Sequence, residues 1–465
     1  MKIQFSITDR RILSIALPAI VSNITVPLLG VVDVAVTGHM GTTDAFSGEV
    51  CSMSSSSYVG AIAVGGMLFN LIYWVFAFLR MGVGGETAQA WGRRDLVSVL
   101  ALLLRGLLFA LILAAVLMAL SPVVSDMALF HIAPESDVAA LARTYYNICI
   151  WGAVPALGLF VMNGWYIGMQ NSRIPMFVAV AQNVLNIIAS LFCVYVLHMH
   201  IEGVALGTIF AQWMAFCIAL LLWIRYYGRL WTSWHKSLPS IAVLLRQALN
   251  PVTTSNRQNA ALFLRTLCLI VVHFMFVSAG ASQGTVELAV NTLLMQFSTI
   301  FSYFMDGFAY AGEALVGKSI GAGNSVAYHS VVRRLFLWGG GLSLFFVFLY
   351  YFAGDGFIFM LTDDATVISS AADYRCWTLL LPLCGVASFL WDGIYIGATA
   401  TRLMFLTMAM GMLLFLAGYF WLVPIYGNHG LWLSFNAYLA TRGLMQTMVR
   451  KKILPENFGC LNQKS

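Results

Sequence analysis

The chain has 465 residues, of which 60% are hydrophobic and only 9% charged, and its mean hydropathy is +0.84. A soluble domain carries about 25% charged residues, so this composition excludes an ordinary globular protein and indicates a chain that crosses a membrane many times. The net charge of +6 does not indicate nucleic-acid binding, because the basic residues are spread over the segments between apolar runs. The eight cysteines show no spacing typical of a metal site or a disulfide framework.

Twelve apolar segments are long enough to span a bilayer as helices, because about 20 apolar residues cross the hydrocarbon core. They are residues 12–38, 59–84, 97–120, 144–168, 175–198, 203–224, 259–279, 287–312, 331–353, 374–397, 403–424 and 430–448. An even number of spans places both termini on one side, and the Lys and Arg residues mark that side as cytoplasmic. The opposite loops are acidic, with Arg143 and Arg375 as exceptions. We therefore expect a multi-pass protein of the inner cell membrane with both termini in the cytoplasm.

The two halves of the chain repeat each other at an offset of 229 residues. The offset relates 88–92 to 317–321 and 164–168 to 393–397, and it also relates Arg173 to Arg402 and Tyr145 to Tyr374. Each half contains six spans, so the repeats share one orientation and an axis along the membrane normal. The sequence predicts an all-α protein with a six-helix bundle at 1–224, a cytoplasmic linker at 225–258, a second six-helix bundle at 259–449 and a cytoplasmic tail at 450–465. The linker contains a run, 241–249, that is typical of an interfacial amphipathic helix.

The first span contains Asp33, within the stretch 23–38. A carboxylate near the centre of a bilayer costs roughly 2.5–3.5 kcal/mol, so such residues face a cavity or a partner and serve a function. Pro27 lies earlier in the same span and predicts a bend in the helix. The alternative is that Asp33 lies near the outer water interface and is only solvated.

Other spans carry polar residues at helical spacing, which places them on single helix faces. Candidates beside Asp33 are Asn163, Asn186, Ser190 and Thr208, and candidates for a substrate cavity are Gln182, Asn183, Gln212, Asn291, Met295, Ser302, Asp306, Asp392 and Tyr395. The alternative for each is a hydrogen bond between helices, worth well under 2 kcal/mol. Asp306 precedes Gly307 and could instead cap or kink its helix. Glu86 and Glu313 lie near inner helix ends, where we expect ion pairs with Arg80 or Lys318.

No motif in the sequence indicates an enzyme. It contains no Gly-rich phosphate loop, no HExxH and no Ser/His/Asp pattern, so we expect neither a cofactor nor a metal. Without an ATP site, transport would have to be driven by an ion gradient. Burial disfavours the charged form of a carboxylate, so a buried Asp can take up a proton.

Four stretches resemble one known family. They are SNITVPLLGVVDVAVTGHMG at 22–41, FLRMGVGGETAQAWG at 78–92, FMDGFAYAGEALVGKSIGAGN at 304–324 and WDGIYIGATATR at 391–402. They are similar to the multidrug and toxic compound extrusion (MATE) transporters, most of all to the DNA-damage-inducible protein F branch. The resemblance implies two six-helix bundles in a V around a central cavity. It also implies export of organic, often cationic and amphipathic compounds by antiport with H⁺ or Na⁺.

The resemblance also implies which residues couple transport to the ion. The acid of the first helix matches Asp33, and its polar neighbours match Asn163, Asn186 and Thr208. Many relatives carry a second Asp where this chain has Ser190. One carboxylate compensates a dehydrated Na⁺ poorly but suffices for a proton, so we predict H⁺ as the coupling ion. Na⁺ binding near Asp392 in the second half is the alternative.

Two other functions remain open at this stage. A flippase for lipid-linked precursors would share the fold but would need Arg and Lys residues around its cavity, whereas the basic residues here lie mostly at helix ends. A channel or a non-carrier scaffold would not need the buried Asp33. The expected partners are small organic substrates and the lipid bilayer, with no nucleic acid, and we expect the chain to function as a monomer.

Overall fold

The computed structural model describes residues 6–38, 55–132, 136–233 and 253–454. The first half contains α1 (Ile7–Gly38), α2 (Ser55–Phe76), α3 (Phe78–Gly92), α4 (Leu96–Ile132), α5 (Ser136–Cys149), η1 (Ile150–Gly152), α6 (Ala153–Gly168), α7 (Arg173–Leu191), η2 (Phe192–Val196) and α8 (Ile201–Ser233). The second half contains α10 (Thr253–Gln283), α11 (Thr285–Gly321), α12 (Ser325–Leu361), α13 (Ala365–Gly397), α14 (Thr401–Tyr426), α15 (Asn428–Val449) and η3 (Arg450–Ile453). No strand occurs within these ranges.

The predicted spans are confirmed as helices, and ten helical segments among the described residues are long and apolar enough to cross a membrane. The second span is divided into α2 and α3 at Ala77, where backbone bonds of 3.2 Å join residues three apart. The fourth span is divided into α5 and α6 by η1, just before Pro155, which has no N–H to continue a regular helix. α1 continues as one helix past Pro27. The helices that flank the predicted linker are longer than expected and reach Ser233 and Thr253, and run 241–249 lies outside the described residues.

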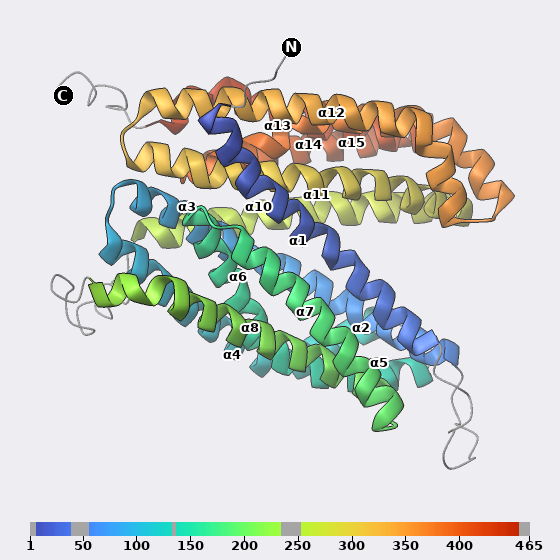
Figure 1. Cartoon of the computed structure of the whole chain (residues 1–465). Helices are drawn as coiled ribbons and strands as arrows, with labels where there is room; N and C mark the ends of the chain where they lie inside the picture. The colour runs from blue at the N-terminus through green and yellow to red at the C-terminus, as the bar shows by residue number, and fades with distance from the viewer. Residues whose placement is uncertain (1–5, 39–54, 133–135, 234–252, 455–465) are drawn as a thin grey trace.

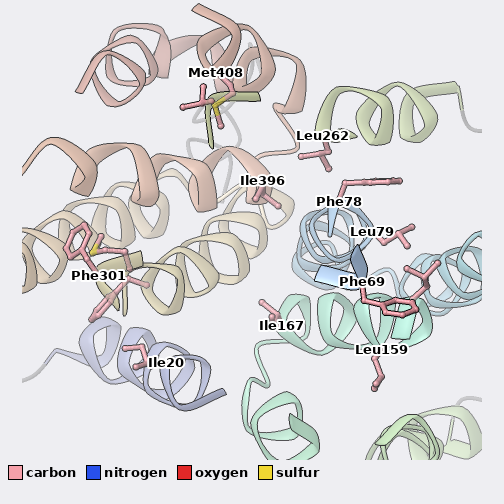
Figure 2. Packing of buried hydrophobic residues seen from close by; sticks show 14 of the residues in the cluster. Ile20, Phe69, Phe78, Leu79, Leu159, Ile167, Leu262, Phe301, Ile396 and Met408 are labelled. Carbon is pink, nitrogen blue, oxygen red and sulfur yellow. The ribbon is translucent and has the colours of Figure 1, made fainter. Parts of the chain in front are cut away.

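The helices form two lobes, which meet at one end of the molecule and separate toward the other (Figure 1). α1 to α8 form the N-lobe, and α10 to α15 form the C-lobe. α1 packs on α7 and α2 of its own lobe and also on α11 and α12, and α10 likewise packs on α14 and on α3. Each lobe therefore places its first helix at the boundary between the two. Figure 2 shows Phe78 of α3 close to Leu262 of α10 at this boundary, and the Phe78 ring lies 5.8 Å from that of Phe263.

Backbone geometry confirms the parallel repeat. Most residues with positive φ fall into pairs separated by 229 positions: Arg94 and Gly323, Gln170 and Thr399, and His198 and Gly427. The two lobes thus turn the chain in the same way after corresponding helices. Gly284 is the remaining described residue with positive φ, and its counterpart position is not described.

Close helix crossings repeat as well, and glycine permits them because it has no Cβ. A Cβ on Gly164 would lie 2.3 Å from the carbonyl oxygen of Arg80, and one on Gly393 would lie 2.1 Å from that of Ala309. The first crossing joins α6 to α3, and the second joins α13 to α11. The glycines of the repeated pentapeptides therefore pack each lobe internally.

A third crossing joins the lobes to each other, at what we call the joined end. A Cβ on Gly92 of α3 would lie 2.3 Å from the carbonyl oxygen of Lys318, and one on Gly321 of α11 would lie 2.0 Å from that of Gln89. The Gln89 side chain donates to the carbonyl oxygen of Gly397 at 2.9 Å, and the Lys318 ammonium donates to Gln170 at 3.2 Å. Hydrogen bonds from both lobes thus close this end around the pseudo-two-fold axis.

The opposite end carries one exposed ion pair in each lobe. Arg143 lies 2.6 Å from Asp126, and Arg375 lies 2.6 Å from Asp355. The two acids are again 229 positions apart, and they occupy α4 and α12. The two basic residues that the sequence placed on the acidic side are therefore each paired with an acid. Large exposed apolar side chains, such as Phe130 and Phe352, cover the outer helix faces, as expected of a surface in lipid.

Candidate functional site

The register of α7 against α1 places Ser190 at the level of Asp33. The Ser172 hydroxyl donates to the carbonyl oxygen of Ile15 at 2.8 Å, and the Asn183 amide donates to that of Thr25 at 2.8 Å. The two contacts keep nearly the same spacing on both helices, so α1 and α7 run parallel with little slippage. Asp33 lies about two turns beyond Thr25 on α1, and the same step from Asn183 reaches Ser190 and Leu191 on α7. The side chain of Asp33 itself lies outside the described residues.

The polar face of α7 is buried against α8. Asn186 is fully buried, and its amide donates to the Thr208 hydroxyl at 3.0 Å, which in turn donates to the Val204 carbonyl oxygen at 3.0 Å. Ser190 is also fully buried, and a Cβ on Gly207 would lie 2.5 Å from its hydroxyl oxygen. The side-chain oxygens of Asn186 and Ser190 have no hydrogen-bond partner among the described residues. Two buried oxygens on one face of α7 are therefore free to meet a further polar group.

The remaining N-lobe candidates lie on three helices. Asn163, on α6, is half-buried, and its amide oxygen has no partner among the described residues. Gln182, on α7, is half-buried one turn before Asn186. Gln212, on α8, points at η1, where its amide oxygen would lie 1.8 Å from a Cβ on Gly152. Asn183 is committed to α1, as described above.

Asp392 is the centre of a buried ion cluster in the C-lobe. Its Oδ2 accepts from Arg265 of α10 at 2.5 Å and from Arg442 of α15 at 2.7 Å, and its Oδ1 accepts from Gln446 at 2.8 Å. The whole Asp392 residue is only 6% exposed, so water does not compete for these bonds. Both carboxylate oxygens are engaged, and three helices are joined at one point.

A second buried ion pair connects the lobes. Arg80 of α3 lies 3.1 Å from Glu313 of α11, which is fully buried, and its guanidinium stands 4.2 Å from the ring centre of Tyr310. The predicted pairing of Glu313 with Arg80 is confirmed. Asp306, one helix stretch earlier on α11, is half-buried and lies where the charges of Arg80 and Arg265 act on it. α11 continues through Gly307 without a break, and that glycine receives Ile20 of α1.

The other C-lobe candidates lie inside the helix packing. Asn291 and Asn428 exchange two amide hydrogen bonds of 2.8 and 2.9 Å, and the Trp432 indole donates to Asn291 at 2.8 Å. The Tyr395 hydroxyl donates to the Gln446 carbonyl oxygen at 2.7 Å. Ser302 donates to the Thr299 carbonyl oxygen at 2.7 Å, and Met295 is buried.

Comparison with known proteins decides the family. The MatE family profile matches residues 18–192 and 261–421, which is most of both lobes. The chain belongs to the MatE family. It is 34% identical to DNA damage-inducible protein F of Escherichia coli strain K12 over 447 residues, which cover 94% of this chain and 91% of that protein.

Solved structures share the fold of this MatE chain. A MATE protein in a bent conformation matches with a TM-score of 0.79 at 17% identity, over 96% of each chain. A transporter of the MOP superfamily from Pyrococcus furiosus matches with a TM-score of 0.77 at 16% identity, over 97% of this chain and 96% of that one. The MatE chain is thus an all-helical membrane protein with the two-bundle fold that the sequence predicted.

Sequence reasoning missed the buried arginines of this MatE chain. The statement that basic residues lie mostly at helix ends is wrong for Arg80, Arg265 and Arg442, which lie within the second, seventh and twelfth predicted spans. A charge inside an apolar run is itself a signal of a buried partner, and it could have identified them. The three arginines are matched in number by three acids, Asp306, Glu313 and Asp392, so the described interior has no excess of basic residues.

Proposed function

We propose that this chain exports organic, often cationic and amphipathic compounds by antiport with H⁺, in the inner cell membrane with both termini in the cytoplasm. Family membership supports extrusion, and the arginine-rich segments beside the joined end support its assignment to the cytoplasmic side. The lobes are joined at that end and separate at the other, as an outward-facing carrier requires (Figure 1). Exchange between this form and one opened at the joined end would carry substrate across.

The coupling site proposed is Asp33 with Asn163, Asn186, Ser190 and Thr208. The observation that carries it is the register that sets Ser190 level with Asp33, next to unpartnered buried oxygens on α7. A protonated carboxyl group donates a hydrogen bond, and the amide oxygen of Asn186 or the hydroxyl of Ser190 can accept it. Proton uptake would therefore replace a charge that lipid and neutral side chains solvate poorly with a satisfied hydrogen bond.

The choice of H⁺ over Na⁺ rests on the distribution of carboxylates. Ser190 is neutral, so Asp33 would face a bound Na⁺ with no second charge from α7. Na⁺ binding near Asp392 would need that carboxylate to leave two arginines and a glutamine that occupy both of its oxygens. Breaking a buried ion pair in this way costs about 3–5 kcal/mol. A flippase for anionic lipid-linked precursors is not favoured, because the described buried arginines are matched by acids.

The test is efflux of a fluorescent cationic dye from proteoliposomes. We expect transport when a pH gradient is imposed and none when only a Na⁺ gradient is imposed at fixed pH. Robust efflux on Na⁺ alone, unaffected by a protonophore, would overturn the proton assignment. Dye flux that needs neither gradient would instead indicate a channel or scaffold. The same preparation, measured by mass photometry in nanodiscs, tests the expected monomer.

A further inference from the structure

A cavity of about 190 Å³ lies at the joined end, between α1, the turn from α6 to α7 and the turn from α11 to α12. Its polar lining consists of Thr8, Arg11, Gln170, Lys318, Ser319 and Asn324. The volume equals that of about six water molecules at roughly 30 Å³ each, so a tetrahedral phosphate group fits. α1 and Gln170 belong to the N-lobe, whereas the other walls belong to the C-lobe, so the cavity spans the lobe boundary.

The cavity is positively charged. Arg11 lies close enough to Lys318 for the two positive charges to act on each other, and no acid lines the cavity. The nearest acid on α1, Asp9, is engaged with Arg334 at 3.2 Å and with the Trp338 indole at 3.1 Å. Two cations that face one cavity without an acid need an anion from outside the chain.

The pseudo-symmetric position in the other lobe lacks this charge. The counterpart of Lys318 is Gln89, which bridges the lobes as a neutral amide at 2.9 Å from Gly397. The counterpart of Asn324, which caps α12, is Asp95, which accepts from the Ser98 N–H and hydroxyl at the start of α4. Bridging and capping therefore need neither the lysine nor a neutral cap. Relative to the repeat, this cavity has gained a base and lost an acid.

We propose that the cavity binds the phosphate group of an acidic phospholipid at the membrane surface of the joined end. Helix ends mark this surface, and Ile7 and Val326, which flank lining residues, are 74% and 73% exposed and offer apolar contact for acyl chains. The N-terminus of α12 adds the partial positive charge of its dipole. A headgroup held by Arg11 and Lys318 touches both lobes, so it stabilises the joined form. This inference is independent of the exported substrate and of the coupling ion.

The experiment transplants the residues of the other lobe into the cavity. Lys318→Gln copies Gln89 and retains a donor for Gln170, and Asn324→Asp copies Asp95 and retains the cap, so the double variant is expected to fold. Arg402→Gln removes an exposed charge that does not line the cavity and serves as the control. Purified proteins are placed in nanodiscs of phosphatidylcholine, with or without phosphatidylglycerol. Thermal stability and lipids retained in native mass spectrometry are then measured.

We expect phosphatidylglycerol to raise the melting temperature of the wild type and of Arg402→Gln, and to bind about fivefold more weakly for each unit of charge changed in the cavity. Arg11→Gln, which leaves the lobe bridge and the cap intact, should show the single-charge loss. Equal responses of the double variant and the wild type would overturn the proposal, as would an equal loss in Arg402→Gln. Inorganic phosphate added to phosphatidylcholine nanodiscs separates the two sources of the anion. If it stabilises the wild type fully and phosphatidylglycerol adds nothing, the site binds a free anion and the lipid proposal fails.

Discussion

The crossing of α3 and α11 predicts how the joined end can be forced open. In the double variant Gly92→Ala and Gly321→Ala, the new methyl groups would lie 2.3 and 2.0 Å from the carbonyl oxygens of Lys318 and Gln89. Side-chain carbons do not approach backbone oxygens closer than about 3.0 Å, so the helices must move apart by about 1 Å. That movement lengthens the hydrogen bond from Gln89 to Gly397, now 2.9 Å, because both glycines and both bonds lie at the same crossing.

The cost falls only on the form in which the lobes are joined. Overpacking by a methyl group in a well-packed contact costs about 1–3 kcal/mol. Each substitution should therefore shift the balance between the joined form and a form opened at this end by about 5- to 150-fold. Since both lobes lose the same contact, the effects should add in the same direction.

The assay is electron–electron double resonance between spin labels at Arg173 and Arg402, which occupy equivalent exposed positions at the joined end of the two lobes. We expect a longer distance to become populated in the double variant. Gly340→Ala is the matched control, because no atom lies within 4 Å of the added carbon. Gly164→Ala makes a similar clash inside one lobe, so it should lower the melting temperature without changing the distance. An unchanged distance distribution in the double variant would refute the reasoning.

Three further predictions concern acidic residues. Asp33→Asn should abolish gradient-driven efflux while the protein remains folded, and retained efflux in proteoliposomes would show the acid to be structural. Asp392→Asn should destabilise the C-lobe by about 3–5 kcal/mol, because Arg265 and Arg442 would keep buried charges without a carboxylate; an unchanged melting temperature would contradict this. Hydrogen bonds from the Thr366 hydroxyl and from the backbone N–H groups of Thr366 and Val367 lower the pKa of Asp364, the cap of α13, below 3.8. Its capping contribution is therefore complete above that value and is lost as the pH falls through the lowered pKa, so hydrogen exchange at the start of α13 should rise below about pH 4. Exchange at the start of α12, which is capped by the neutral Asn324, should show no such rise.

Much of the fold follows from the sequence because lipid leaves the backbone few choices. An apolar run of about 20 residues must satisfy its own hydrogen bonds, so runs became helices and charged segments became their ends. The offset of 229 residues predicted the parallel repeat, and the structure confirms it in the paired positive-φ residues and the paired glycine crossings. Even the pairing of Arg80 with Glu313 could be predicted, because both lie near the same ends of symmetry-related helices.

Other features depend on how helices rotate and slide against one another, which a linear pattern does not contain. Spacing placed Asn186 and Ser190 on one face of α7, but only the contact from Asn183 to Thr25 set that face level with Asp33. Asp392 seemed an accessible acid, yet α10 and α15 bring two arginines to it. The anion cavity joins lining residues from both lobes that are more than 300 positions apart in the chain. The sequence determined which helices form, whereas side-chain packing between helices decided which charges are neutralised and which remain for a ligand.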